Sequence, residues 1–205
     1  MHRLTVLILV AVVSTTHLAA QGRLCFSPAP GPACSAFTLT TFGGYVVLGS
    51  DQTGDTPFRE VADWGLMANV GPRDAIGVSM FASADRLGLA VGPAVHYRRW
   101  LSSDESFEVA VGTPLVSSGD KVRAGSVFGL VKWSPSRWFA LAARPEIISQ
   151  TVYSCGPTTC GAVAGARARM SLGAETSGVP GLVLSLVGGA ATFVVALVAL
   201  GAAGD

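Results

Sequence analysis

Charged residues are scarce in this chain of 205 residues. Asp, Glu, Lys and Arg together make up 13% of it and the formal net charge is +1, whereas soluble domains contain roughly 25% charged residues. A nearly neutral chain offers no electrostatic basis for binding nucleic acid, so no nucleic-acid partner is expected. The mean hydropathy of +0.50 instead predicts that part of the protein contacts lipid.

Residue types that carry catalysis are also few. The chain has three histidines, of which His2 and His17 lie in the N-terminal leader, so His96 alone remains for the rest of the chain. A lone histidine on a strand is typical of a packed polar residue, and it does not complete a Ser-His-Asp set. No cysteine pair has the CxxC spacing of a zinc site. We therefore expect no catalytic residues, no metal, no cofactor and no enzymatic activity.

Residues 1–20 have the pattern of a secretory signal peptide. A basic Arg3 precedes the apolar run Leu4–Val13, and Ala20 provides a small residue at a cleavage site before Gln21. The alternative is an N-terminal membrane anchor, but the apolar run is short of the roughly 20 residues that a spanning helix needs. The leader predicts an exported protein.

The cysteines of an exported protein can form disulfides. The chain has four of them, which allow three pairings. The simplest pairing joins sequence neighbours, Cys25 with Cys34 and Cys155 with Cys160. Residues 21–35 would then be a stapled loop that is rich in Pro and Gly. The segment CGPTTC is interpreted as a structural staple in a hairpin loop rather than as a redox pair.

The stretch Asp74–Trp100 alternates between two kinds of side chain, which is typical of strands with two different environments. Leu89, Val95 and Tyr97 fall on one face, whereas His96 and Arg98 fall on the other. The same alternation recurs along the chain and predicts strands at 36–48, 60–70, 74–100 (a hairpin), 107–115, 122–133, 138–151 and 161–174. The predicted fold is all-β, an antiparallel up-and-down β-barrel of about eight strands over residues 36–174.

Seven charged residues of the predicted strands fall on the face that we assign to the barrel interior. These residues are Asp63, Arg98, Glu108, Arg144, Glu146, Arg167 and Arg169. Both signs are present, as buried charges require. The opposite face is apolar and suits lipid. In the reverse assignment, a soluble barrel, the surface would carry broad Gly and Ala stripes with few charges, which is a poor surface composition.

Tryptophans accompany the turns that follow the even-numbered strands. In a closed meander those turns lie at one end, so Trp100, Trp133 and Trp138 are expected to form an aromatic girdle at the lipid–water interface. The alternative is that each tryptophan simply packs beneath its turn.

Strands such as RLGLAVGPAVHYRRW and KVRAGSVFGLVKW, with short turns at one end and longer polar loops at the other, resemble the small bacterial outer-membrane barrels of the OmpA/OmpX-like, porin-family type. The resemblance covers residues 36–174. It implies a protein of the cell outer membrane, with the lipid bilayer as partner and a structural or surface-interaction role. Loops 50–57 and 153–160 would contact a surface or envelope partner. The interior of so small a barrel is filled by side chains, so no open pore is expected.

Residues 175–205 form a hydrophobic C-terminal segment, which we predict to be helical. Within it, 179–200 is uncharged and long enough for a transmembrane helix. A hairpin with Gly188-Gly189 as its turn is the alternative. A helix here opens a second functional hypothesis: a periplasmic β-barrel anchored by this helix in the inner membrane and binding a small apolar ligand.

Overall fold

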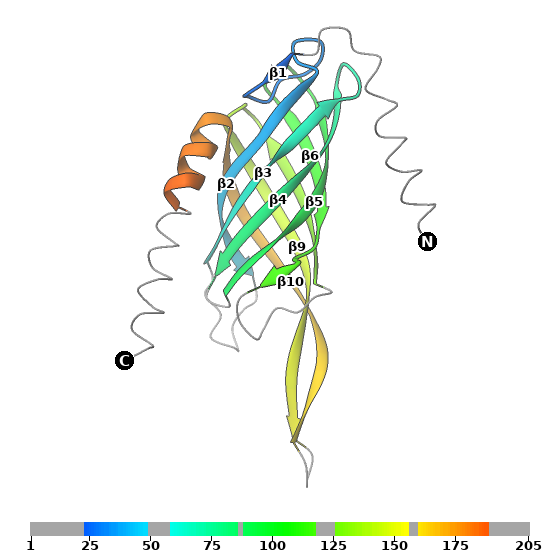
Figure 1. Ribbon diagram of the computed structural model, residues 1–205, viewed down its shortest axis with the longest axis vertical. Coiled ribbons are helices and arrows are strands. Elements are labelled where there is room, and N and C mark those ends of the chain that lie inside the picture. Colours follow the sequence, from blue (N-terminus) through cyan, green and yellow to red (C-terminus); the bar gives the residue numbers. More distant parts are fainter. Residues whose placement is uncertain (1–22, 49–57, 86–87, 118–125, 156–159, 189–205) are drawn as a thin grey trace.

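The chain folds into a closed β-barrel of eight antiparallel strands (Figure 1). A computed structural model describes residues 23–48, 58–85, 88–117, 126–155 and 160–188. Each barrel strand pairs with the next barrel strand along the chain, and the last strand pairs with the first, which leaves no open edge. The strands are β2 (Ala36–Leu48), β3 (Phe58–Asn69), β4 (Asp74–Asp85), β5 (Gly88–Trp100), β6 (Ser106–Gly112), β8 (Val127–Ser134), β9 (Phe139–Cys155) and β10 (Cys160–Ser177). The predicted fold class is confirmed.

Several strand boundaries differ from the sequence-based expectation. Strand β8 begins at Val127 rather than at residue 122. Strand β9 runs to Cys155 and β10 begins at Cys160, so residues 153–155 and 160 of the expected loop 153–160 belong to strands. The strand expected at 107–115 ends at Gly112, because Pro114 has no N–H group to continue the ladder; the two-residue strand β7 (Val116–Ser117) then pairs with β5. The last strand runs to Ser177 rather than to residue 174, because the chain continues to pair with β2 to that point.

Side chains alternate between the interior and the outer surface of the barrel, most regularly along β6. Along β6, residues 106, 108, 110 and 112 are buried whereas 107, 109 and 111 are exposed. The interior holds three clusters of buried apolar side chains, with buried charged residues beside them. The barrel is therefore a filled cylinder with an apolar outer surface, since large exposed apolar residues recur along its strands.

The two ends of the barrel differ. One end carries the turns at residues 70–73, 101–105 and 135–138, and we call it the turn end. At the opposite end, which we call the loop end, the β9–β10 hairpin projects beyond the barrel (Figure 1). Strand β9 pairs with β8 only as far as Ile147, and β10 pairs with β2 only from Met170, so the strands between these points pair with each other alone.

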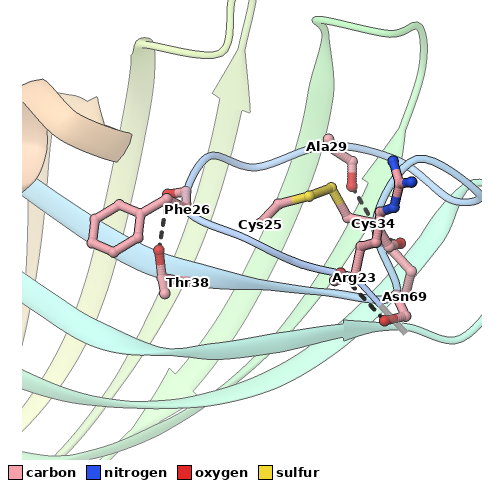
Figure 2. Close-up of a disulfide and its surroundings, with 8 residues drawn as sticks. Arg23, Cys25, Phe26, Ala29, Cys34, Thr38 and Asn69 are labelled. Atoms are coloured by element: carbon pink, nitrogen blue, oxygen red, sulfur yellow. Dashed lines mark hydrogen bonds between the residues drawn. A yellow bond between two sulfur atoms is a disulfide. The ribbon is translucent and has the colours of Figure 1, made fainter. Parts of the chain in front are cut away.

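The disulfide predicted between Cys25 and Cys34 is confirmed (Figure 2). Asn69 on β3 fixes this loop by donating its side-chain N–H groups to the carbonyl oxygens of Ala29, at 2.9 Å, and Cys34, at 2.7 Å. Cys25 ends the short strand β1 (Leu24–Cys25) and packs against the apolar cluster at the turn end. The stapled loop therefore covers the turn end of the barrel.

The other predicted disulfide lies at the tip of the projecting hairpin. The backbone register pairs Cys155 directly with Cys160, as the last pair of the ladder. Their side chains lie outside the described part of the structure, so this disulfide stays a prediction.

A helix over residues 178–188 follows β10 and packs against the outer surface of the barrel beside β2 (Figure 1). Thr40 donates its hydroxyl hydrogen to the carbonyl oxygen of Gly178 at 3.0 Å, and Trp64 Nε1 donates to Ser185 Oγ at 3.1 Å. The prediction of a helix is confirmed for residues 178–188. The alternative, in which these residues form the first strand of a hairpin that turns at Gly188-Gly189, is wrong. In the described ranges, no helix is long and apolar enough to cross a membrane. The signal peptide, loop 50–57 and the rest of the tail lie outside those ranges.

Candidate functional site

All seven residues of the predicted interior charge network lie on the inner face of their strands. Six of them have buried side chains, and Arg167 lies further along β10 toward the projecting hairpin. The structure brings the six into two separate groups, which we name the turn-end network and the loop-end network. Asp63, Arg98 and Glu108 belong to the first, and the other three belong to the second.

The turn-end network is centred on Glu108, whose side chain is 0% exposed. This carboxylate accepts hydrogen bonds from Arg98 Nε at 2.7 Å and contacts Lys132 Nζ at 2.9 Å and His96 Nδ1 at 3.0 Å. Lys132 reaches a second carboxylate, Glu175, at 3.1 Å, and Glu175 accepts the hydroxyl hydrogen of Tyr45. Arg98 and Lys132 are thus paired with Glu108 and Glu175, as buried charges require, and the third carboxylate of the network, Asp63, accepts a hydrogen bond from Ser79.

One part of this network has the hydrogen-bond order of a Ser-His-Glu triad. Ser79 Oγ lies 2.8 Å from His96 Nε2, and His96 Nδ1 lies 3.0 Å from Glu108 Oε1. A nucleophilic serine needs space beside its oxygen for a substrate carbonyl. Ser79 is buried instead, donates to Asp63 Oδ1 at 3.1 Å, and does not line the cavity found at the loop end. We therefore interpret the chain Ser79–His96–Glu108 as interior packing of polar groups.

The loop-end network places three arginines around two carboxylates. Glu146 accepts hydrogen bonds from Arg144 Nε at 2.7 Å and Arg169 Nε at 2.6 Å, and it also pairs with Arg59. Asp85 Oδ2 lies 2.7 Å from Arg59 Nη2 and 3.4 Å from Arg169 Nη2. Asp85 is the last residue of β4 and Arg59 is the second residue of β3, so the network lies at the loop end of the barrel.

A cavity adjoins this network. It has a volume of about 30 Å³ and is partly open to solvent. Its wall combines cationic, aromatic and hydroxyl groups, including Arg59, Phe81, Ser83, Phe128, Arg144 and Arg169. The Arg144 guanidinium carbon lies 3.6 Å from the centroid of the Phe128 ring and 5.1 Å from that of Phe81, which is within cation–π distance.

The predicted aromatic girdle is only partly observed. Trp133 and Trp138 point outward, 43% and 46% exposed, at the turn end. The placement of Trp100 in the girdle is wrong: its side chain is 2% exposed and packs edge-on against Phe37 inside the barrel. The physical reason is the two-residue period of the strand, which puts Trp100 on the same face as Arg98. The outward aromatic residue on this strand is Tyr97.

Sequence reasoning missed several members of the two networks. These are Tyr45, Arg59, Asp85, Lys132 and Glu175. The period of two offered a signal for some of them, since Arg59 shares a face with Asp63 and Glu175 shares one with Arg169. Both lie just outside the strand limits expected from sequence, so the signal was lost at the strand ends.

Comparison of the chain with known protein families, with curated proteins and with solved structures finds no match in any of the three. Among the residues that the structure describes, no group of three His, Cys, Asp or Glu side chains is placed to hold a metal ion. The function is therefore inferred from the geometry of the barrel itself.

Proposed function

We propose that the protein is an outer-membrane β-barrel with a non-enzymatic, structural or surface-interaction role. The observation that carries this proposal is the apolar outer surface of the barrel. Surfaces in water rarely expose contiguous apolar patches larger than a few hundred Å², but lipid favours them. The exposed apolar residues come from all around the barrel and include Val46, Leu66, Ile76, Val78, Met80, Leu89, Val95, Val109, Val111, Val131, Leu141 and Leu172.

The height of this surface fits a lipid bilayer. On β5 the outward apolar side chains extend from Leu89 to Tyr97, which is about 27 Å along a strand at roughly 3.4 Å per residue. A tilt of about 40° reduces this to roughly 21 Å, close to the band of about 25 Å of outer-membrane barrels. The outward Trp133 and Trp138 lie where the turn end would meet the membrane interface.

The interior supports a structural role rather than transport. Two charge networks and three apolar clusters fill the barrel along its length, as expected for eight strands. The competing hypothesis, an apolar ligand held in a soluble barrel, is less well supported, because the cavity at the loop end has a volume of only about 30 Å³ and carries Arg59, Arg144 and Arg169 among its apolar residues. The hairpin that projects from the loop end provides the surface for a partner (Figure 1).

The test is fractionation of bacterial membranes after expression of the full chain, followed by a gel that compares heated and unheated samples. The expected result is outer-membrane location with a faster band in the unheated sample. A chain truncated before Gly178 serves as the comparison. It should still require detergent, whereas a soluble truncated protein, or inner-membrane location of the full chain, would overturn the proposal.

A further inference from the structure

The helix over residues 178–188 packs against the barrel with its small residues and turns its large apolar residues outward. Gly181, Ser185 and Gly188 recur at a spacing that places them on one face of the helix, and the first two are buried. The outward side chains, each 43–63% exposed, are those of Val179, Val183, Leu184, Leu186 and Val187. A helix on the surface of a protein in water has the opposite arrangement, with its large apolar side chains toward the core.

The small residues allow the helix to approach β2 closely. A Cβ atom at Gly181 would lie 2.7 Å from the carbonyl oxygen of Thr40, and a Cβ atom at Gly188 would lie 2.9 Å from Cε2 of Phe42. Close contact through small residues is typical of helices packed within membranes, because large apolar side chains gain nothing there by leaving the lipid. The packing of this helix therefore has the character expected in a bilayer.

The polar side chains beside the helix are hydrogen-bonded within the protein. Thr38 donates its hydroxyl hydrogen to the carbonyl oxygen of Phe26 in the stapled loop, at 2.9 Å (Figure 2). Thr40 and Trp64 donate to the helix itself. Ser185, which accepts the bond from Trp64, donates its own hydrogen to a carbonyl oxygen of the helix at 2.9 Å. Such satisfaction is what lipid requires, since it offers no water to polar groups.

The outward face of the helix continues the apolar outer surface of the barrel beside β2 (Figure 1). Residues 189–200, which follow the helix in the sequence, carry no charged side chain. We propose that this face of the helix contacts lipid acyl chains, so that helix and barrel lie side by side in one membrane. The inference rests on the proposed function, because it takes the barrel surface itself to lie in lipid. It makes the helix a part of the lipid-facing wall rather than an anchor for a barrel in water.

The first test introduces the photoreactive residue p-benzoylphenylalanine at Leu186 or at Val78 of the full chain, folded into vesicles of dimyristoylphosphatidylcholine. The two positions are matched, since both native side chains are 62% exposed, one on the helix and one on β4. After illumination, mass spectrometry should find a lipid adduct at both positions. The background is set by the same residue at Ser103, which is exposed in a turn.

The two positions distinguish failure of this inference from failure of the proposed function. A lipid adduct at Val78 without one at Leu186 would overturn the inference and leave the barrel in lipid. A crosslink from Leu186 to a second copy of the chain in place of lipid would also overturn it. Absence of the adduct at Val78 would overturn both, because the barrel would then lie in water and the helix would be at most its anchor.

A second test reports on the packing of the helix against the barrel. With p-benzoylphenylalanine in place of Phe42, illumination should link β2 to the helix, since Phe42 lies beside Gly188. Gly181→Leu should abolish this internal link, because its side chain would meet the backbone of β2. Val183→Leu is the matched control and should retain the link, since Val183 points outward from the same helix. Persistence of the link in Gly181→Leu protein that shows the heat-modifiable band would overturn the proposed packing, and so would its loss in Val183→Leu.

Discussion

Glu108 on β6 and Lys132 on β8 are paired across adjacent strands. Their side chains point into the barrel interior, where Lys132 Nζ lies 2.9 Å from Glu108 Oε1. Both side chains are almost fully buried. The pair links the two halves of the turn-end network, because Glu108 also binds Arg98 and Lys132 also binds Glu175. Loss of Glu108 would therefore leave Arg98 without its carboxylate, and loss of Lys132 would leave Glu175 without its ammonium group.

Replacing Glu108 with Gln should lower the free energy of unfolding by about 3–5 kcal/mol, because it leaves buried cations without their shared carboxylate. Urea unfolding of the detergent-folded protein, followed by tryptophan fluorescence, measures the change. Glu105→Gln is the matched control: Glu105 lies in a turn and accepts a hydrogen bond from Trp133, which Gln can also accept. Equal shifts of the two variants would contradict the structural role of the network.

A substitution at Val78 tests whether the outer surface of the barrel contacts lipid. Val78 is 62% exposed in the middle of β4. If this face contacts lipid, Val78→Arg should disfavour insertion into bilayers by about 2–4 kcal/mol, whereas Val78→Leu should be neutral. The folded fraction in lipid vesicles, read from the heat-modifiable band, measures the effect. A barrel that folds in water would instead tolerate the arginine, and normal folding of Val78→Arg would argue against a membrane location.

A substitution at Gly65 tests how closely the backbones of β3 and β4 approach each other. A Cβ atom at this position would lie 2.1 Å from the carbonyl oxygen of Val78, so any side chain must push the paired backbones apart. Gly65→Ala should destabilise the barrel by roughly 1–3 kcal/mol. Gly129→Ala is the control, because its Cβ would meet only Pro145 Cγ at 3.4 Å. Similar urea midpoints for the two variants would show that the contact is not tight.

The disulfide at the turn end should stabilise the loop that it closes. Its cysteines are 9 residues apart, and a loop of that length corresponds to about 2.5 kcal/mol in the chain-entropy account. The double variant Cys25→Ser, Cys34→Ser should therefore unfold at lower urea concentration but still form the barrel, because Asn69 retains its two bonds to the loop. Loss of the heat-modifiable band would show instead that the staple is needed for assembly.

Peptide mapping without reduction tests the remaining cysteines. The backbone register places Cys155 opposite Cys160 at the hairpin tip, and a peptide linked through both is the expected product. Alkylation of either cysteine in the unreduced protein would show that the tip carries free thiols.

Much of the architecture follows from local pattern. The two-residue period gave the strands, the closed meander and the face on which Asp63, Glu108 and Glu146 lie, because the pleat of a strand sends alternate side chains to opposite faces. The prediction for Trp100 was wrong because it relied on the position of this residue beside a turn, whereas the two-residue period places its side chain inside the barrel. The disulfide of Cys25 and Cys34 followed from their closeness in sequence.

The pairing of the charges was decided only by the tertiary structure. Which arginine meets which carboxylate depends on strand register, tilt and closure, and these bring Arg59 to Glu146 across 87 positions of sequence. The cavity at the loop end arises in the same way. The sequence determined the two faces of each strand because side-chain alternation is local, whereas the contacts across the interior exist only once all eight strands have closed.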